Sequence, residues 1–192
     1  MDENKNNEVD LALHEAGHLV FGLCDIYGKI ESLFPTKIWI NKFEEAGKVC
    51  NFTWFPNGYY NNQDVPLLKY KKEACKTIGG RIAETFLNNR NLPNFSNRKD
   101  EDEDSISDIV KFNQLIVKIV KLETGISVNE DNKELRIKYE QEIWGDCIDY
   151  LKINKNVQDA IKHVANELQM NNFIEGENLK TLIIDVNKLL DN

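Results

Sequence analysis

The sequence predicts an α+β fold that is mostly helical, with one N-terminal helix, a small three-stranded sheet and then a bundle of helices. Two observations support this fold class. Apolar residues recur at helical spacing through most of the chain, and three short segments rich in β-branched and aromatic residues lie between residues 29 and 55. With 192 residues, of which 41% are hydrophobic and 29% charged, we expect a single globular domain over residues 1–192.

The elements follow in order along the chain. The first helix covers residues 9–23, where apolar side chains return every three or four positions. Three segments bounded by turn-forming residues are the predicted strands: 29–34, 37–41 and 48–55. Helical patterns then predict five helices, at residues 65–88, 105–123, 131–153, 156–171 and 176–190. We therefore expect residues 1–123 to carry the sheet and the candidate functional residues, and residues 124–192 to form C-terminal helices.

Charge and composition exclude several classes of protein. The net charge is −8 and no basic stripe is interleaved with aromatic residues, so we expect no nucleic acid partner. No apolar run is long enough for a membrane span, and the polar N-terminus is not a signal peptide, which favours a cytoplasmic location. The four cysteines are far apart in the sequence, so we expect small buried apolar residues rather than disulfides or metal ligands.

The most informative motif is H-E-x-x-H at residues 14–18, inside the first predicted helix. His14 and His18 are four residues apart, so both imidazoles leave the same helix face and can bind one metal ion. Zn²⁺ suits this pair because it binds neutral imidazole. Glu15 lies beside the pair and can accept a proton from zinc-bound water and pass it to the leaving amine. Two of the three histidines in the chain fall in this motif.

A zinc hydrolase needs a third protein ligand and one open coordination position. His163 points away from the apolar stripe of its helix, which favours a solvent-exposed position. Asp108 lies on the apolar stripe of the helix predicted over residues 105–123, where a carboxylate is costly unless it is paired or metal-bound. Ser105 and Asp108 also match a helix-start pattern. The spacing alone therefore leaves open whether Asp108 binds metal or stabilises the start of the helix.

Several motifs resemble the protease domain of the FtsH-type ATP-dependent zinc metalloproteases, and together they extend over nearly the whole chain. The H-E-A-G-H string at residues 14–18 is similar to the metal-binding helix of that family. The G-G-R-I-A-E string at residues 79–84 is similar to its G-G-R-x-A-E helix. Residues 48–56 resemble its edge strand, residues 107–109 resemble its S-N-D segment, and residues 157–182 resemble its closing pair of helices.

The resemblance implies an FtsH-like peptidase fold in which His14, His18 and Asp108 bind Zn²⁺. It favours Asp108 over Asp104, which lies on the same helical face. The substrate backbone would add as an extended strand to residues 48–55. The substrate-binding residues on that strand would be Asn51, Phe52, Thr53 and Trp54.

The helix predicted over residues 65–88 carries small residues at helical spacing. Cys75, Gly79 and Ala83 recur every four positions, and small side chains let two helix backbones approach closely. A glycine pair inside a helix lowers stability unless packing requires it. We therefore expect this face to press against the helix with the two histidines. Glu84 could then accept a hydrogen bond from a ligand imidazole, although an ion pair with Arg81 is an equally good alternative.

The family carries membrane-spanning segments and an ATPase module, whereas this chain has no membrane span and no G-x-x-x-x-G-K-[ST] phosphate loop. We therefore expect a zinc metalloendopeptidase that hydrolyses unfolded or flexible polypeptides without ATP, with or without a separate ATPase or adaptor, and as a monomer or a homo-oligomer. The first alternative is a catalytically inactive, zinc-stabilised binding or regulatory protein with the same fold. The second is a different zinc peptidase scaffold, such as a regulatory peptidase that cleaves one repressor.

Overall fold

The computed structural model describes residues 3–27, 32–33, 35–41, 46–50, 53–54, 64–89 and 103–191. Six helices make up most of the described chain: α1 (Glu3–Leu23), α2 (Asp64–Leu87), α3 (Glu103–Thr124), α4 (Lys133–Ile153), α5 (Lys155–Asn171) and α6 (Gly176–Leu190). The strands are β1 (Ser32–Leu33), β2 (Lys37–Asn41), β3 (Ala46–Cys50), β4 (Thr53–Trp54) and β5 (Phe173–Glu175). A short 3-10 turn, η2 (Glu130–Asn132), precedes α4. The predicted α+β class with a helical majority is confirmed.

The predicted helices α2 to α6 agree with the structure to within two residues at each end, whereas α1 begins six residues earlier than predicted. The first residues of α1 are polar, so the apolar periodicity that revealed the helix does not extend over them. α5 ends at Asn172, which has a left-handed conformation with a φ of 56°. Asparagine tolerates this conformation better than most residues, and the turn leads the chain directly into β5.

The sheet differs from the predicted one, which had three consecutive strands at residues 29–34, 37–41 and 48–55. Only two of these strands, β2 and β3, pair with each other, as an antiparallel pair of five residues each. The other neighbour of β2 is β5, which comes from the C-terminal region. β1 pairs with β4 in a separate two-stranded sheet. The prediction was wrong because local patterns reveal which segments are extended, but not which strand edges meet in the folded chain.

The third predicted strand, residues 48–55, is divided between the two sheets. Its first part lies in β3, and Thr53 and Trp54 form β4. Asn51 and Phe52 lie outside the described residues. In the three-stranded sheet the order is β3-β2-β5, so β3 is an edge strand with one neighbour among the described strands. Of the predicted strand 48–55, only the part in β3 therefore lies at an edge of the three-stranded sheet, and β5 forms its other edge among the described strands.

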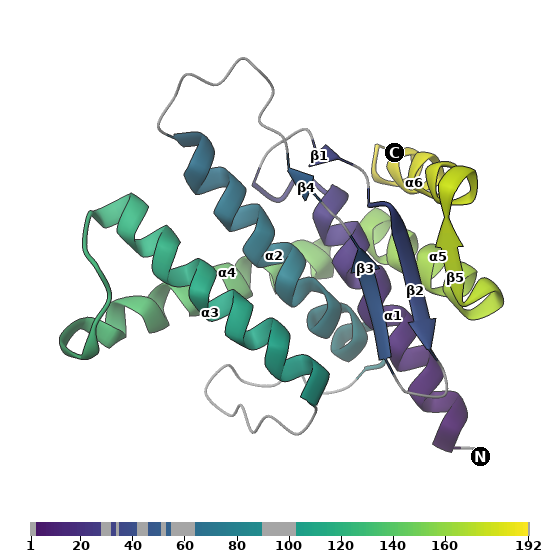
Figure 1. Ribbon diagram of the computed structural model, residues 1–192, viewed down its shortest axis with the longest axis horizontal. Helices are drawn as coiled ribbons and strands as arrows, with labels where there is room; N and C mark the ends of the chain where they lie inside the picture. The colour runs from purple at the N-terminus through teal and green to yellow at the C-terminus, as the bar shows by residue number, and fades with distance from the viewer. Residues whose placement is uncertain are drawn as a thin grey trace.

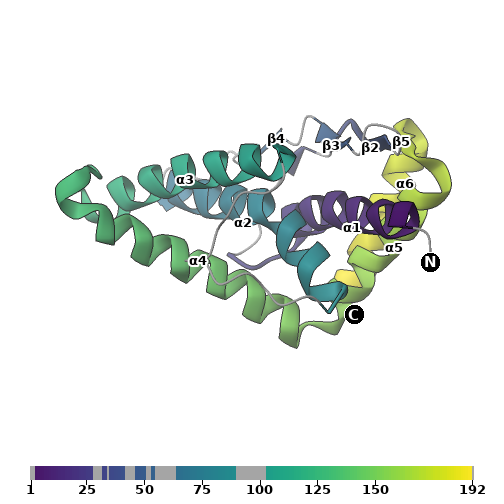
Figure 2. The same ribbon diagram turned by 90° about the horizontal axis from the view of Figure 1, so that it is seen from below.

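α1 occupies the centre of the molecule. It packs against α2 over much of its length, against α5 on another side, and against β2 and β3 on a third. Figures 1 and 2 show the strands on one side of α1 and α5 on the opposite side. Leu19, Val20 and Phe21 of α1 are completely buried, as is Ile38 of the sheet. The H-E-x-x-H motif thus lies on a helix that packs against α2, α5 and the sheet.

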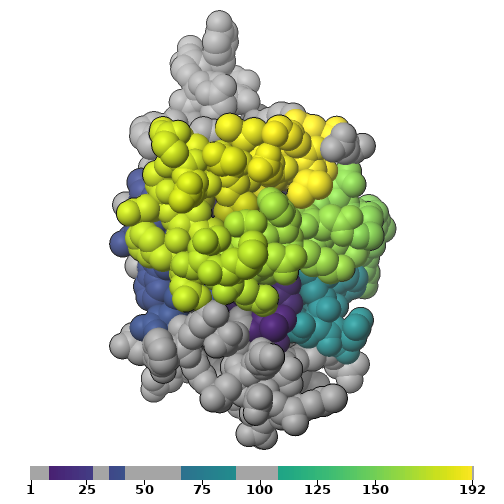
Figure 3. All heavy atoms as spheres, turned by 90° about the vertical axis from the view of Figure 1, so that its right-hand side faces the viewer, coloured from purple at the N-terminus to yellow at the C-terminus, as the bar shows by residue number. Residues whose placement is uncertain are grey.

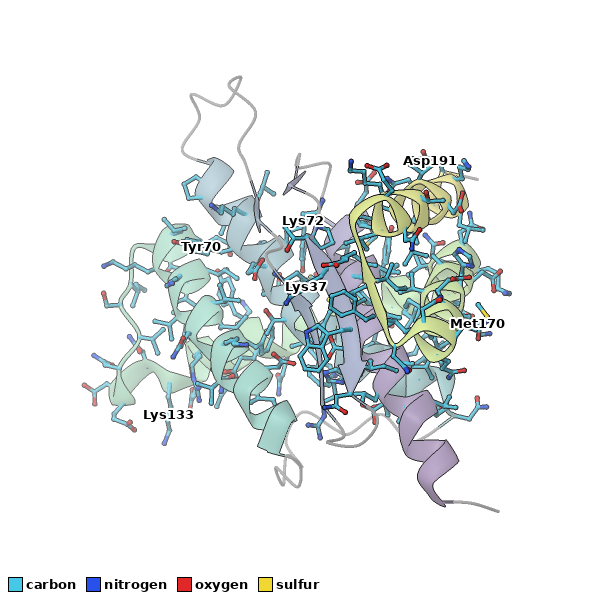
Figure 4. The ribbon with its side chains drawn as sticks, turned by 45° about the vertical axis from the view of Figure 1, so that its right-hand side comes forward. Lys37, Tyr70, Lys72, Lys133, Met170 and Asp191 are labelled. Carbon is cyan, nitrogen blue, oxygen red and sulfur yellow. The ribbon has the colours of Figure 1, made fainter. Side chains whose placement is uncertain are left out.

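α3 and α4 extend away from the sheet, and α4 runs back along the molecule to the start of α5 (Figure 2). Tyr70 lies on the side of α2 that faces α3 (Figure 4), and the ammonium of Lys118 is 5.3 Å from the centre of its ring. α5 and α6 cover the opposite end of the molecule (Figure 3). Within the part of the chain that the structure describes, no helix is both long and apolar enough to cross a membrane.

Three of the four cysteines lie in the core with free thiols: Cys24, Cys75 and Cys147. This agrees with their predicted role as small buried residues. Burial raises the pKa of the Cys24 thiol to about 12, so this thiol is protonated at neutral pH. The side chain of Cys50 lies outside the described residues.

Candidate metal centre

α1 directs His14 and His18 from one helix face toward α2 and α3. The two residues are one helical turn apart, so their rings leave the helix side by side. Their Nε2 atoms are 3.0 Å apart, and their ring planes stand at 81° to each other. Only 14% of the His14 side chain and 12% of the His18 side chain are exposed. The two rings therefore present their Nε2 atoms to one common point, as the motif predicts.

Asp108 reaches the same point from the N-terminal part of α3. Its Oδ2 atom is 3.1 Å from His18 Nε2 and 3.5 Å from His14 Nε2. Among the residues whose side chains the structure describes, these three form the one group of metal-binding residue types whose ligand atoms all lie within 4.8 Å of one another. The side chain of Asp104, the alternative on the same helix, lies outside the described residues. The fold thus brings together the three residues that the sequence analysis favoured.

The donor set and spacing fit a zinc ion. Zinc binds imidazole nitrogen at about 2.0–2.1 Å and carboxylate oxygen at about 2.0–2.2 Å, mostly in tetrahedral geometry. Such bond lengths place neighbouring ligand atoms about 3.3–3.4 Å apart, and the three separations here are 3.0, 3.1 and 3.5 Å. Three protein ligands also leave one of the four tetrahedral positions open, as in catalytic zinc sites.

Each of the three side chains is held by a further contact. His14 Nδ1 is 3.2 Å from Glu84 Oε2, and His18 Nδ1 is 2.7 Å from the backbone oxygen of Lys76. Because a carbonyl oxygen only accepts hydrogen bonds, Nδ1 of His18 carries a proton, and Nε2 is the nitrogen directed at Asp108 and the candidate metal position. The Lys111 ammonium is 3.6 Å from Asp108 Oδ1. Outer contacts of this kind orient metal ligands in proteins.

Glycines on both α1 and α2 allow the two helices to pack closely at the histidines. A Cβ atom on Gly80 would lie 2.6 Å from His18 Nε2 and 2.8 Å from the backbone oxygen of His14. A Cβ atom on Gly17 of α1 would lie 2.4 Å from the backbone oxygen of Gly79. Carbon atoms do not approach other atoms so closely, so α1 and α2 can pack at this distance only with glycine at these positions. The prediction that the glycine face presses against the histidine helix is confirmed.

The charges around the cluster favour a cation. Burial lowers the pKa of His14, but hydrogen bonds to Asp108 and Glu84 and the nearby Glu15 carboxylate outweigh it and raise this pKa to about 10. Burial raises the pKa of Asp108, but its hydrogen bonds to the two histidines outweigh it and hold this pKa well below its usual range. Carboxylates that stabilise a positive charge on an imidazole also stabilise a divalent cation at the same place.

No protein-family model matches the chain, and no curated protein matches it either. The resemblance to the FtsH-type proteases therefore stays an expectation from the motifs, and the argument for function rests on the geometry of this cluster.

Glu15, the predicted general base, is a buried carboxylate next to this cluster. Only 4% of its surface is exposed, and its charge raises the pKa of His14, so the two groups are close. It leaves α1 between the two histidines in sequence, yet it is absent from the group of three ligand residues. Glu15 is therefore placed beside the candidate ligands without being one of them.

The other predicted residues lie elsewhere or outside the described part. His163 lines a cleft of about 360 Å³ between α5 and α6, together with Glu167 and Asp185, so it is half-buried rather than fully solvated. It is not part of the metal-binding group. Of the predicted substrate-binding residues, Thr53 and Trp54 are described only as the backbone of β4.

Sequence reasoning missed two groups that contact the cluster. The backbone oxygen of Lys76 cannot be found from side-chain patterns, because every residue carries one. Lys111 did leave a signal, since it lies three residues after Asp108 and such pairs face each other on a helix. The sequence did not decide whether Glu84 contacts a ligand imidazole or Arg81, and in the structure it contacts His14.

Proposed function

We propose that this protein is a zinc-dependent metalloendopeptidase that hydrolyses peptide bonds in unfolded or flexible polypeptides. The observation that carries the proposal is the convergence of two histidine Nε2 atoms and one carboxylate oxygen within 3.5 Å of one another. Glu15, a buried glutamate beside them, is the proposed general base. Two imidazoles, one carboxylate and an open position are typical of zinc hydrolases.

In this proposal His14, His18 and Asp108 hold the zinc ion. The ion, when bound, activates water and polarises the peptide carbonyl. Glu15 accepts the proton that the attacking water loses and delivers it to the nitrogen of the leaving amine.

The substrate backbone adds to the sheet along β3. β3 is an edge strand and packs beside α1. Figures 1 and 2 show the N-terminal end of α3, from which Asp108 projects, next to β3. An extended peptide paired with β3 would therefore lie next to the metal cluster. Strand addition requires an unfolded segment, so we propose that the chain acts on flexible polypeptide and does not need ATP. We place this activity in the cytoplasm, where the chain acts alone or with a separate ATPase or adaptor.

The test combines metal analysis with a cleavage assay of a permanently unfolded protein. We expect one zinc ion per chain and cleavage by the wild type, with or without ATP. Glu15→Gln should retain zinc and fold but lose about 10²–10⁴-fold in rate, because a carboxamide cannot accept the proton. Glu134→Gln, on the exposed first turn of α4, is the matched control and should cleave like the wild type.

Two outcomes would contradict the proposal. If protein that has been supplied with zinc binds less than half an equivalent per chain, the proposed metal site is wrong. Zinc binding without any cleavage by the wild type would instead favour a zinc-stabilised binding protein.

A further inference from the structure

Lys111 brings an ammonium group beside the candidate metal centre. It lies one turn after Asp108 on α3, with Nζ 3.6 Å from Asp108 Oδ1. The other oxygen of this carboxylate, Oδ2, faces the two histidines. The side chain of Lys111 is 63% exposed, whereas that of Asp108 is 21% exposed. Lys111 thus lies near the oxygen that the histidines do not use, and most of its side chain is exposed to solvent.

We propose that Lys111 binds the negative charge that develops on the substrate carbonyl oxygen during peptide hydrolysis, an inference that rests on the proposed function. When water attacks the carbonyl carbon, a C–O bond forms and the π electron pair moves onto the carbonyl oxygen, while Glu15 takes a proton. When the C–N bond breaks, the electron pair returns to the carbonyl and the amine takes that proton. The carbonyl oxygen therefore carries negative charge between the two events, and a nearby cation stabilises it.

The other charged groups that act on His14 are acidic. Glu15 and Glu84 are acidic and would repel the developing charge. Lys76 is on the adjacent helix, but its ammonium is 2.6 Å from the Glu73 carboxylate. Of these residues, only Lys111 brings a cation into contact with a member of the cluster.

The contact of Lys111 with Asp108 is also loose. A separation of 3.6 Å is longer than a direct N–H···O hydrogen bond of up to about 3.2 Å. A lysine carries its charge on a flexible stem with three rotatable donors. The ammonium can therefore turn from Asp108 to a second anion without breaking a tight hydrogen bond. A purely structural ion pair on the same helix turn would contribute little to stability and nothing to anion binding.

The first experiment measures anion binding without turnover. The full chain is loaded with Co²⁺, whose visible spectrum reports its ligands, and is titrated with dimethylphosphinate, a tetrahedral monoanion. In Lys111→Gln the dissociation constant for phosphinate should rise about fivefold, as expected for one exposed charge. Lys111→Arg keeps the charge and should stay within about twofold of the wild type.

Lys121→Gln is the matched control. Lys121 is exposed and lies on the same helix, ten residues further on and about 15 Å along its axis. Lys121→Gln makes the same change in net charge as Lys111→Gln and should leave phosphinate binding unaltered.

The second experiment measures cleavage of an unfolded protein by the zinc-loaded chain. Lys111→Gln should lower kcat about tenfold and change KM less than twofold, because the charge exists only during the reaction. Equal phosphinate affinity in Lys111→Gln and the wild type would overturn the role of Lys111 while leaving the metal site intact. A wild type that gives no cobalt spectrum would overturn the proposed metal site itself, and with it this inference.

Discussion

His14, His18 and Asp108 each direct one polar atom to a common point, and each is held there by a second contact. The histidines use their Nδ1 atoms for this purpose, one with a carboxylate and one with a backbone carbonyl. The aspartate uses its Oδ1 atom, near an ammonium. At the scale of single residues, these second contacts hold the three side chains in the arrangement that the proposed metal site requires.

Asp108→Asn tests the third ligand. We expect zinc affinity to fall at least tenfold, because an amide oxygen carries no negative charge and the loss of a ligand carboxylate weakens the site. Competition with a chelating dye measures this affinity. Asp104→Asn, on the preceding turn of α3, should change it little. The opposite pattern in the two variants would assign the third ligand to Asp104.

At the scale of elements, the contact between α1 and α2 sets the geometry of the cluster. A Cβ atom on Gly17 of α1 would lie 2.4 Å from the backbone oxygen of Gly79, and one on Gly79 of α2 would lie 2.7 Å from Cβ of Phe21. The same approach brings Glu84 of α2 to His14 and the Lys76 carbonyl to His18. Close helix packing and the orientation of the imidazoles therefore have one cause.

Gly17→Ala should destabilise the protein. Its Cβ atom would lie 2.4 Å from the backbone oxygen of Gly79, and such overpacking costs roughly 2–3 kcal/mol because backbone must move. Chemical denaturation measures the free energy of unfolding. Gly145→Ala is the control: a Cβ atom at this position of α4 would meet nothing within 4 Å. It should raise the free energy of unfolding by about 0.5–1 kcal/mol, since alanine favours the helix. Equal effects of both substitutions would contradict the proposed close contact.

At the scale of the whole molecule, the cluster joins α1 to α3, which are separated in the sequence by the sheets and α2. In the proposed metal-bound state, an ion held by both helices would link the N-terminal helix to the arm formed by α3 and α4. Since the unfolded chain does not assemble this site, metal binding would stabilise the folded state.

Zinc should therefore raise the temperature of unfolding. At a free zinc concentration about 100 times the dissociation constant, linkage predicts about 2.7 kcal/mol of added stability. Calorimetry with and without zinc measures the shift, and the control is Asp108→Asn, in which most of the shift should be lost. A shift of equal size in that variant would mean that the stabilising zinc binds elsewhere.

The local features of this protein were predictable from the sequence. The helices follow from apolar periodicity over a few turns, and α2 to α6 agree with the prediction to within two residues. The pairing of the His14 and His18 rings follows from a spacing of four residues on one helix. Both depend only on residues that are close in the chain, which is why spacing suffices to predict them.

The long-range features required the tertiary structure. Spacing left Asp108 undecided between a metal ligand and a helix-start residue, and the packing of α3 near α1 brought its carboxylate to the histidines. Glu84 was undecided in the same way, until the close approach of α1 and α2 placed it at His14. The sheet was predicted wrongly because its third strand, β5, returns from the C-terminal region to pair with β2. The sequence by itself therefore determined the helices and the two-histidine motif. Tertiary structure decided the third member of the cluster and the partners of each strand, because these depend on surfaces that meet only once the chain has folded.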